Sequence, residues 1–383
     1  MNALRVGLFT ECYHPIQNGI VASIDALAGT LRDNGHDAVV ITPEMPSYRD
    51  VPGDDVVRVP SLPLPTRTAY RLTVPYLPRA IGALSIVHAH SPFVTGWLGV
   101  RAARRARVPL VFTYHTQLEA YAHYVPFESH ATRSAATRLT RLFANGADAV
   151  IVPTLAMEAR LRAMGVRARI EVVPSGIDRA LFARGRRRRD VRARFGIDDT
   201  YKLVLSVGRL GREKNIELAL HAFARLDDFA ARLVIVGDGA HRPVLERLAA
   251  RLNIATRTTF AGEYSRDALP DVYASADAFV FTSSSETQGL VLVEALAAGT
   301  PVVALDTPQT RDVLAGAGIV CRNDPSAVAA ALRSTLAGER ADPRRGAAVA
   351  DTYDGLAIGA RVIALYDSLV AAPPVRELVA AHR

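Results

Sequence analysis

Apolar and polar residues alternate along the first half of the chain in blocks that predict a parallel α/β domain. Short apolar runs are separated by segments whose apolar positions recur every three to four residues, which is the spacing of a helix with one buried face. Continuous apolar strands joined by helices are typical of βαβ units whose sheet is covered on both faces. The expected strands are Leu4–Phe9, Ala38–Thr42, Ile86–Ala89, Leu110–Thr113 and Ala149–Val152, and the expected helices include Ile20–Asp33, Thr95–Arg107, Ala131–Phe143 and Leu155–Met164.

The second half repeats this arrangement, so the fold class is α/β with two doubly wound parallel-sheet domains facing each other across a cleft. A length of 383 residues suits two domains. We place the N-terminal domain at 1–174, the C-terminal domain at 175–352 and a terminal helical segment at 353–383. The expected strands are Lys202–Val207, Leu233–Val236, Ala278–Thr282, Val302–Leu305 and Ile319–Cys321, and the expected helices are Ile216–Leu226, Pro243–Leu252, Gly289–Ala298, Ala327–Leu336 and Tyr353–Leu369.

Composition narrows the choice of compartment and partner. The net charge of +8 suits an acidic partner such as nucleotide phosphate or an anionic lipid surface. Nucleic acid is not expected, because no aromatic residues are interleaved with the basic run RGRRRRDVRARF, which as an interdomain segment is expected to be solvated. Cys12 and Cys321 match no disulfide or zinc spacing, and neither a signal peptide nor a membrane-spanning run is apparent, so a cytoplasmic location is expected.

The most specific motif is Glu286-Thr-Gln-Gly-Leu-Val-Leu-Val-Glu294. It follows an expected strand and enters a helix that is apolar on every side, so the helix is expected to be buried. A buried carboxylate at Glu294 is costly unless it is hydrogen-bonded, and a vicinal diol such as that of a ribose would satisfy it. The helix N-terminus at Gly289 suits a phosphate. The alternative is a pair of incidental glutamates, one exposed and one capping the helix.

A second motif, Gly208-Arg209-Leu-Gly-Arg-Glu-Lys214-Asn215, follows the strand KLVLSV. Arg209 and Lys214 leave the same strand end, where both can reach a diphosphate and stabilise the charge that grows on a departing nucleotide. A solvated basic loop is the competing interpretation.

Two further signals are weaker. Gly19 precedes a helix whose free N–H groups can face a phosphate or an acceptor, and Gly237 lies in the strand–loop pair VGDGAHR. In FTYHTQLEAYAHY, His115 follows a strand end, and its neighbours could hydrogen-bond sugar hydroxyls or be half-buried packing; these neighbours are Glu119, Tyr121, His123 and Tyr124.

Taken in order, these motifs resemble those of the retaining family-4 glycosyltransferases of the GT-B fold. The resemblance runs over nearly the whole chain, through NGIVASIDALAGTLRDNGHDAVVITP, FTYHTQLEAYAHY, VPSGID, SVGRLGREKN, IVGDG and ETQGLVLVEALAAGTPVVA. It implies a hexose transferred from a nucleotide-diphosphate sugar without a bound metal or other cofactor. It also implies that the terminal helix crosses back to the N-terminal domain. Two departures are NGI in place of a Gly-Gly pair, and TPQTRDV, which leaves Asp312 where a glutamate is common.

The resemblance carries a role to each matching position. Arg209 and Lys214 match the basic pair on the diphosphate, Glu286 the glutamate on the transferred sugar, and Glu294 the ribose ligand. Other matches are Gly289 and Leu290 as backbone donors, His115 beside the sugar, and Gly19 near the diphosphate and acceptor.

The acceptor is less constrained. The segment YHTQLEAYAHYVP resembles the subgroup that glucosylates diacylglycerol, and basic helices suit a peripheral position on the inner face of the cell membrane. These helices carry Arg101, Arg104, Arg105, Arg107, Arg133, Arg138 and Arg141, the last three together with leucines and Phe143. An arginine-rich composition explains the same charges. Alternatives are a soluble or polysaccharide acceptor with GDP-mannose as donor, a nucleotide-sugar 2-epimerase, and a non-catalytic binding module.

Overall fold

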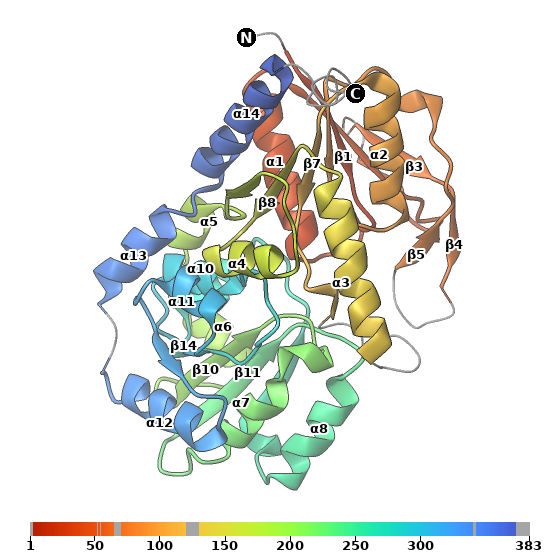
Figure 1. Ribbon diagram of the computed structural model, residues 1–383. Helices are drawn as coiled ribbons and strands as arrows, with labels where there is room; N and C mark the ends of the chain where they lie inside the picture. The colour runs from red at the N-terminus through yellow and green to blue at the C-terminus, as the bar shows by residue number, and fades with distance from the viewer. Residues whose placement is uncertain are drawn as a thin grey trace. The chain divides into compact units, whose positions relative to one another are not determined.

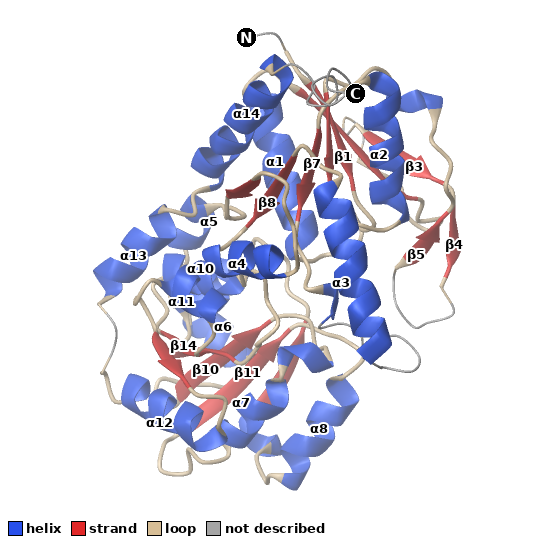
Figure 2. Cartoon of the chain, in the orientation of Figure 1, coloured by secondary structure: helices blue, strands red, loops and turns tan. Residues whose placement is uncertain are grey.

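The chain folds into two compact units. The computed structural model describes residues 3–51, 53, 55–64, 70–119, 130–339 and 342–372 (Figure 1). Unit 1 comprises the residues up to Gly176 together with those from Gly355 onward, and unit 2 comprises Ile177–Asp354. Helices and parallel strands alternate in both (Figure 2).

The described residues of unit 1 build a seven-stranded sheet in the order β3-β2-β1-β6-β7-β8-β9, with every neighbouring pair parallel. A short antiparallel pair, β4 and β5, lies outside it. The strands are β1 (Arg5–Phe9), β2 (Asp37–Pro43), β3 (Val56–Val59), β4 (Ser61–Pro63), β5 (Arg71–Thr73), β6 (Ile86–Ala89), β7 (Leu110–Thr113), β8 (Ala149–Val152) and β9 (Ile170–Val172). The helices are α1 (Gly19–Asp33), η1 (Arg79–Ile81), α2 (Val94–Ala106), α3 (His130–Asn145), α4 (Leu155–Ala163) and α14 (Gly355–Ala371).

The described residues of unit 2 build a six-stranded parallel sheet in the order β12-β11-β10-β13-β14-β15. Its strands are β10 (Lys202–Val207), β11 (Ala231–Val236), β12 (Thr258–Gly262), β13 (Ala278–Phe281), β14 (Val302–Leu305) and β15 (Ile319–Cys321). Its helices are α5 (Arg179–Ala183), α6 (Arg189–Arg194), η3 (Arg212–Lys214), α7 (Ile216–Phe223), α8 (Arg242–Arg251), η4 (Ala255–Arg257), α9 (Leu269–Ala274), α10 (Leu290–Ala297), α11 (Pro308–Leu314), α12 (Pro325–Leu336) and α13 (Pro343–Asp351).

In each sheet the order of the strands reverses next to the first strand, β1 or β10, while all strands stay parallel. This is the Rossmann order. Ligands of open α/β sheets bind beyond the carboxyl ends of the strands at this switch point. In unit 1 the switch lies between β1 and β6, and in unit 2 between β10 and β13. The loops that follow these four strands are therefore where the chemistry of each unit is expected.

The two-sheet α/β fold expected from the sequence is confirmed, and the strands that were not predicted lie at or outside the edges of the sheets. The strands β3, β9 and β12 were not predicted, nor was the β4–β5 pair. These edge strands are only partly buried, whereas the central strand β6 is buried throughout. Their apolar signal is weaker because an edge strand does not need two apolar faces.

The terminal helix α14 packs along α1 within unit 1 (Figure 1). A Cβ added to Gly359 would lie 2.5 Å from Cγ2 of Thr30, so the close approach of the two helices requires a glycine here. Tyr366, near the end of α14, is fully buried. Helix α14 is thus part of the core of the first unit.

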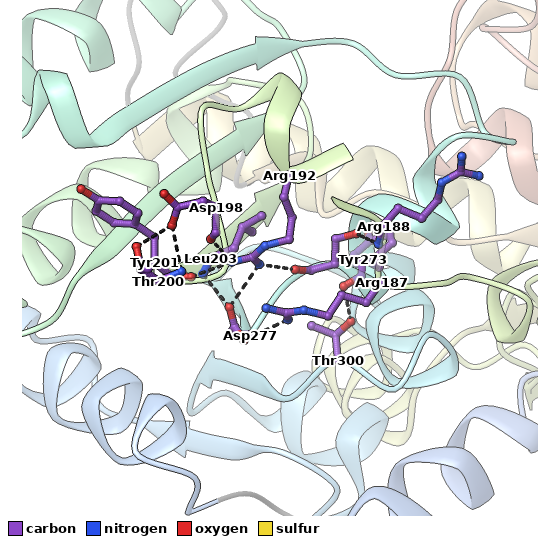
Figure 3. Close-up of polar contacts among 11 residues, drawn as sticks. Arg187, Arg188, Arg192, Asp198, Thr200, Tyr201, Leu203, Tyr273, Asp277 and Thr300 are labelled. Atoms are coloured by element: carbon purple, nitrogen blue, oxygen red, sulfur yellow. Dashed lines mark hydrogen bonds and ion pairs between the residues drawn. The ribbon is translucent and has the colours of Figure 1, made fainter. Parts of the chain in front are cut away.

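Most arginines of the arginine-rich run are exposed, as expected from the sequence, but Arg192 is buried. Arg192 of α6 is only 1% exposed, and Figure 3 shows its guanidinium directed at the residues that precede β10 and β13. It donates to the carbonyl oxygens of Ser275 (2.8 Å), Tyr201 (2.6 Å) and Asp198 (3.1 Å), and lies 3.4 Å from Oδ2 of Asp277. A planar fork of five donors meets several acceptors at once, which allows this charge to be buried.

Candidate active site

The two most specific motifs meet in unit 2, at the switch point between β10 and β13. Lys214, at the end of η3, pairs through Nζ with Oε1 of Glu286, in the loop that follows β13. The two side chains are 21% and 20% exposed. The residues are far apart in sequence, so the fold rather than local geometry brings cation and carboxylate together.

Hydroxyl groups join the same two loops. The hydroxyls of Ser283 and Ser285 donate to the carbonyl oxygen of Glu213, at 3.4 and 3.3 Å, and Oγ1 of Thr282 donates to the carbonyl oxygen of Lys214 at 3.3 Å. Side chains at the end of β13 thus satisfy backbone acceptors of η3, which fixes the path of the basic loop.

Opposing effects set the ionisation of Glu286. Burial alone would raise the pKa of its carboxyl, but the charge of Lys214, hydrogen bonds from Lys214 and Ser283, and the charge of Arg209 together hold that pKa below its ordinary value. Glu286 is therefore a carboxylate at neutral pH. It can accept hydrogen bonds from hydroxyl groups but cannot donate a proton to a leaving group.

Arg209, just after β10, is ion-paired with Glu213. The Glu213 side chain is 1% exposed, whereas that of Arg209 is 45% exposed. The buried carboxylate of Glu213 thus binds one side of the Arg209 guanidinium. An oxyanion could approach the exposed side of the same guanidinium.

Glu294 lies inside α10 and is 7% exposed. Its Oε2 accepts a hydrogen bond of 2.9 Å from the hydroxyl of Tyr273, which lies on α9. Burial raises the pKa of Glu294, while the charge of Arg266 and the bond from Tyr273 act in the opposite direction. A buried carboxylate with so few partners is suited to accept further hydrogen bonds from a polyol.

Gly289 is the N-cap of α10, which begins at Leu290, one residue after the start expected from the sequence. Gly289 has φ of 86°, a left-handed conformation that favours glycine, and an added Cβ would lie 3.1 Å from Cζ of Phe281. Leu290 is the first helical residue, so its N–H is among those that an α-helix leaves without an intrahelical acceptor. An anion at this point would also meet the positive end of the helix dipole.

Gly237 has a structural reason to be glycine. It has φ of 125°, and an added Cβ would lie 2.1 Å from the carbonyl oxygen of Gly208. The N–H of Leu210 donates to the carbonyl of Asp238 at 2.9 Å, which joins the loop after β11 to the basic loop. The glycine therefore shapes the backbone that carries Arg209.

Unit 1 brings two histidines together at the carboxyl ends of β6 and β7. His115, two residues beyond β7, has its Nε2 2.9 Å from Nδ1 of His90, which directly follows β6. The two rings are stacked at 5.2 Å between centroids. Burial lowers the pKa of His115 to about 4, so its ring is neutral at physiological pH.

The start of α1 offers fewer donors than the sequence suggested. Asn18 caps the helix that begins at Gly19, and its Oδ1 accepts from the N–H groups of Ile20 and Val21, each at 2.9 Å. The N–H of Ala22 donates to the carbonyl of Asn18. The expectation that the first turn has free N–H groups is therefore wrong for these three residues, because Asn is a strong N-cap.

The proposed acceptor side is only partly described. Glu119 lies in unit 1 and accepts from Nε of Arg160 at 2.8 Å, so its carboxylate has an internal partner. Tyr121, His123 and Tyr124 lie outside the described residues.

The arginines expected on basic helices are exposed, at Arg101, Arg104 and Arg105 on α2, at Arg107 after it, and at Arg133, Arg138 and Arg141 on α3. Phe143, on the same helix as the α3 arginines, is 1% exposed and belongs to the core of unit 1, whereas Leu142 is 55% exposed. The apolar residues of α3 are thus divided between the core and the surface.

Two kinds of feature are absent from the described residues. No helix there is long and apolar enough to cross a bilayer. In the same part of the chain, no cluster of three or more His, Cys, Asp or Glu side chains is placed to hold a metal ion.

Sequence reasoning missed three residues of these sites. Tyr273 and Glu213 contact candidate site residues, and His90 contacts His115. Tyr273 and Glu213 gave no signal, because a partner on another element is not visible in sequence. The pattern His-Ala-His directly before a loop could have indicated His90, since polar residues at a strand end of this sheet point to a site.

Two Rossmann-type units, with basic and acidic motifs joined at a switch point, define a glycosyltransferase of the GT-B class. A sucrose-phosphate synthase from Thermosynechococcus elongatus has this fold, with a TM-score of 0.80 at 24% identity over 97% of this chain and 100% of that one. Residues 17–181 match the family model "Glycosyltransferase Family 4", and residues 187–349 match "Glycosyl transferases group 1".

Curated relatives agree with these matches. The chain is 34% identical to an alpha-monoglucosyldiacylglycerol synthase of Streptococcus pneumoniae, over 81% of this chain and 73% of that protein. It is 35% identical to a GDP-mannose-dependent alpha-mannosyltransferase of Mycobacterium tuberculosis, over 82% of each. The chain belongs to glycosyltransferase family 4, and it is an enzyme of the hexosyltransferase class; a retaining mechanism fits that family.

Proposed function

We propose that this enzyme transfers glucose or mannose from a nucleotide-diphosphate sugar to a hydroxyl of a membrane lipid such as diacylglycerol. The observation that carries the proposal is the pairing of Lys214 with Glu286 at the switch point of unit 2. One loop then supplies cations for the diphosphate and the adjoining loop supplies a carboxylate for the sugar.

The proposed donor site uses residues that surround this pair. Lys214 and Arg209 bind the diphosphate and stabilise the negative charge that develops when the sugar departs. Glu294 accepts from the ribose hydroxyls, and the N-terminus of α10, at Gly289 and Leu290, contributes backbone donors. Gly237 supports the basic loop, and Gly19 is a further donor-binding residue, near the diphosphate and the acceptor.

Glu286 serves in this mechanism as a positioning carboxylate. Its lowered pKa keeps it ionised, so it can orient the transferred sugar by accepting from its hydroxyls. In a front-face transfer, the leaving phosphate takes the proton of the acceptor hydroxyl, and no protein carboxylate has to shuttle it. His115 is neutral, so its ring can form a hydrogen bond with a sugar hydroxyl without adding charge to the site.

A lipid acceptor is supported by the diacylglycerol-linked relative and by the exposed arginines of α2 and α3. Each arginine near an anionic surface contributes about 1 kcal/mol. A hollow of about 360 Å³ on α3 is lined by Arg133, Arg138 and Arg141, together with Glu119. These charges suit an anionic membrane surface, where the enzyme would act peripherally.

The similarity to a GDP-mannose-dependent enzyme supports a second candidate, which is mannosyl transfer to a saccharide or other soluble acceptor. Both candidates use the same donor geometry and differ in base, sugar and acceptor.

Thermal unfolding with UDP-, GDP- and ADP-sugars separates the donors. A ligand at one hundred times its Kd stabilises the folded state by about 2.7 kcal/mol, so the true donor produces a clear shift. Radiolabelled transfer to diacylglycerol in anionic liposomes is then compared with transfer to soluble saccharides. Failure to label lipid and to float with anionic vesicles at low salt would contradict the lipid acceptor, and the absence of a shift with any nucleotide sugar would contradict the donor class.

A further inference from the structure

A cluster of three buried polar side chains in unit 1 contacts His115 through His90. His88 belongs to β6, His90 follows that strand, and Tyr366 comes from α14. His88 and His90 are 1% and 3% exposed, and Tyr366 is fully buried. Two buried histidines outside the donor site need a reason, because burying polar rings is costly unless they are paired.

His88 has partners on both ring nitrogens. Its Nδ1 lies 2.6 Å from the hydroxyl of Tyr366, and its Nε2 lies 2.6 Å from Oγ1 of Thr113. Its ring packs against that of His90, with centroids 4.2 Å apart. His88 is therefore held from both ends and forms a fixed surface under His90.

His90 has one partner and one open nitrogen. Its Nδ1 lies 2.9 Å from Nε2 of His115, while its buried Nε2 has no hydrogen-bond partner among the residues that the structure describes. The ring borders a cavity of about 40 Å³ that Ser23 and Ser175 also line. Of the two nitrogens of His90, only Nδ1 is thus committed to a contact.

Protonation states follow from the burial. Desolvation lowers the pKa of His88 to about 3 and that of His115 to about 4; for His90, desolvation and the charges of the other two rings lower the pKa well below its ordinary value. Each ring is therefore neutral and carries one N–H. A buried N–H without an acceptor is rarer and costlier than an acceptor without a donor. The single proton of His90 accordingly belongs on Nδ1, where an acceptor is present.

We propose that His90 is a positioning residue that donates its Nδ1–H to Nε2 of His115 and so holds His115 as the Nδ1–H tautomer in one orientation. His115 then presents Nδ1 as a donor, the polarity needed to contact a hydroxyl oxygen of the sugar. The placement of His115 beside the sugar rests on the proposed function, whereas the link from His90 to His115 does not.

Imidazole ¹⁵N NMR tests the link without any assay of activity. The His115 signals are assigned by their loss in His115→Ala. In the wild type, Nε2 of His115 should be unprotonated and Nδ1 protonated; in His90→Leu this preference should be lost. Protonation of Nε2 in the wild type, or an unchanged His115 tautomer in His90→Leu, would overturn the proposal.

Kinetics with the donor identified by thermal shift provide the second test. His90→Leu should lower kcat about tenfold, as for the loss of one hydrogen bond, with little change in the KM for donor. His90→Asn should recover most of the rate because its amide N–H₂ sits near the position of Nδ1. In the His115→Ala background, His90→Leu should have no further effect. Additive losses would overturn the proposal.

The unfolding midpoint of each variant shows whether a loss of kcat reflects misfolding. For a variant that folds, the NMR result decides the proposal. If the tautomer behaves as expected and no nucleotide sugar is turned over, the proposed function fails and the His90–His115 link stands.

Discussion

Polar groups lie beyond the carboxyl ends of strands in both units, and two of these clusters differ in charge. In unit 2 the residues beyond β10 and β13 form ion pairs, Lys214 with Glu286 and Arg209 with Glu213. In unit 1 the residues beyond β6 and β7 are His90 and His115, whose lowered pKa values keep them neutral.

This difference matches the two ends of the proposed donor. A diphosphate carries charge that grows during transfer and requires cations, whereas sugar hydroxyls are neutral and require directional donors and acceptors. The same strand order thus supports an electrostatic site in one unit and a hydrogen-bonding site in the other. The experiments below test each side of this comparison, beginning with the largest expected effect.

The largest effect concerns buried charge in the framework of unit 2. Arg192→Met should lower the free energy of unfolding of this unit by about 3–5 kcal/mol, because Asp277 and several carbonyl groups lose a buried partner. Arg189→Met, in the same run but 90% exposed, is the matched control and should be without measurable effect. Urea unfolding followed by circular dichroism measures both, and equal stability of the two variants would contradict the role of buried charge.

Lys214→Ala should lower kcat about 10²–10³-fold, the loss expected when one preorganised donor to a developing oxyanion is removed. Lys202→Ala, at the opposite end of β10, should retain normal turnover. Arg209→Ala should behave like Lys214→Ala. Full turnover in both Lys214→Ala and Arg209→Ala would refute the leaving-group site.

Glu294→Gln should weaken the binding of free nucleoside diphosphate about tenfold to a hundredfold, since hydrogen bonds to a charged group are lost. The amide still offers an oxygen to Tyr273, so the fold should be kept. Glu246→Gln, on the exposed face of α8, is the control. Isothermal titration calorimetry compares the three proteins, and unaltered affinity in Glu294→Gln would exclude the ribose role.

A further test concerns the acid sensitivity of the neutral cluster. Burial lowers the pKa of His88 to about 3 and that of His115 to about 4, against about 6.5 in an unfolded chain. Between about pH 6.5 and 4 the unfolded state therefore holds more protons, so stability falls as the pH falls and is level above about pH 7. The slope should approach about 1.4 kcal/mol per pH unit for each histidine.

Unfolding midpoints at pH 7, 6 and 5 should show a shallower decline in His88→Gln than in the wild type. His221→Gln, on α7 of unit 2, should decline as the wild type does. The same slope in all three proteins would mean that the cluster is not protonated on unfolding in the way proposed.

The sequence predicted the centre of each sheet better than its edges. Strands such as Ile86–Ala89 and Lys202–Val207 were predicted to the residue, because most of their positions are buried and apolar. The edge strand Ile170–Val172 was missed, whereas Ile319–Cys321, also at an edge and only partly buried, was predicted.

For the site, motifs that directly follow expected strands predicted which loops carry the chemistry. They did not predict which side chains contact each other. The pairing of Lys214 with Glu286 was not foreseen, and neither was the contact of Tyr273 with Glu294. Such contacts depend on tertiary packing, as does the burial of Arg192 within a run that reads as solvated.

A crystal structure with a bound nucleotide-diphosphate sugar tests the central claim most directly. The account predicts diphosphate oxygens within hydrogen-bond distance of Lys214 and Arg209, the ribose on Glu294 and sugar hydroxyls on Glu286. A diphosphate bound away from the loop that follows β10, with Lys214 still paired only to Glu286, would contradict it.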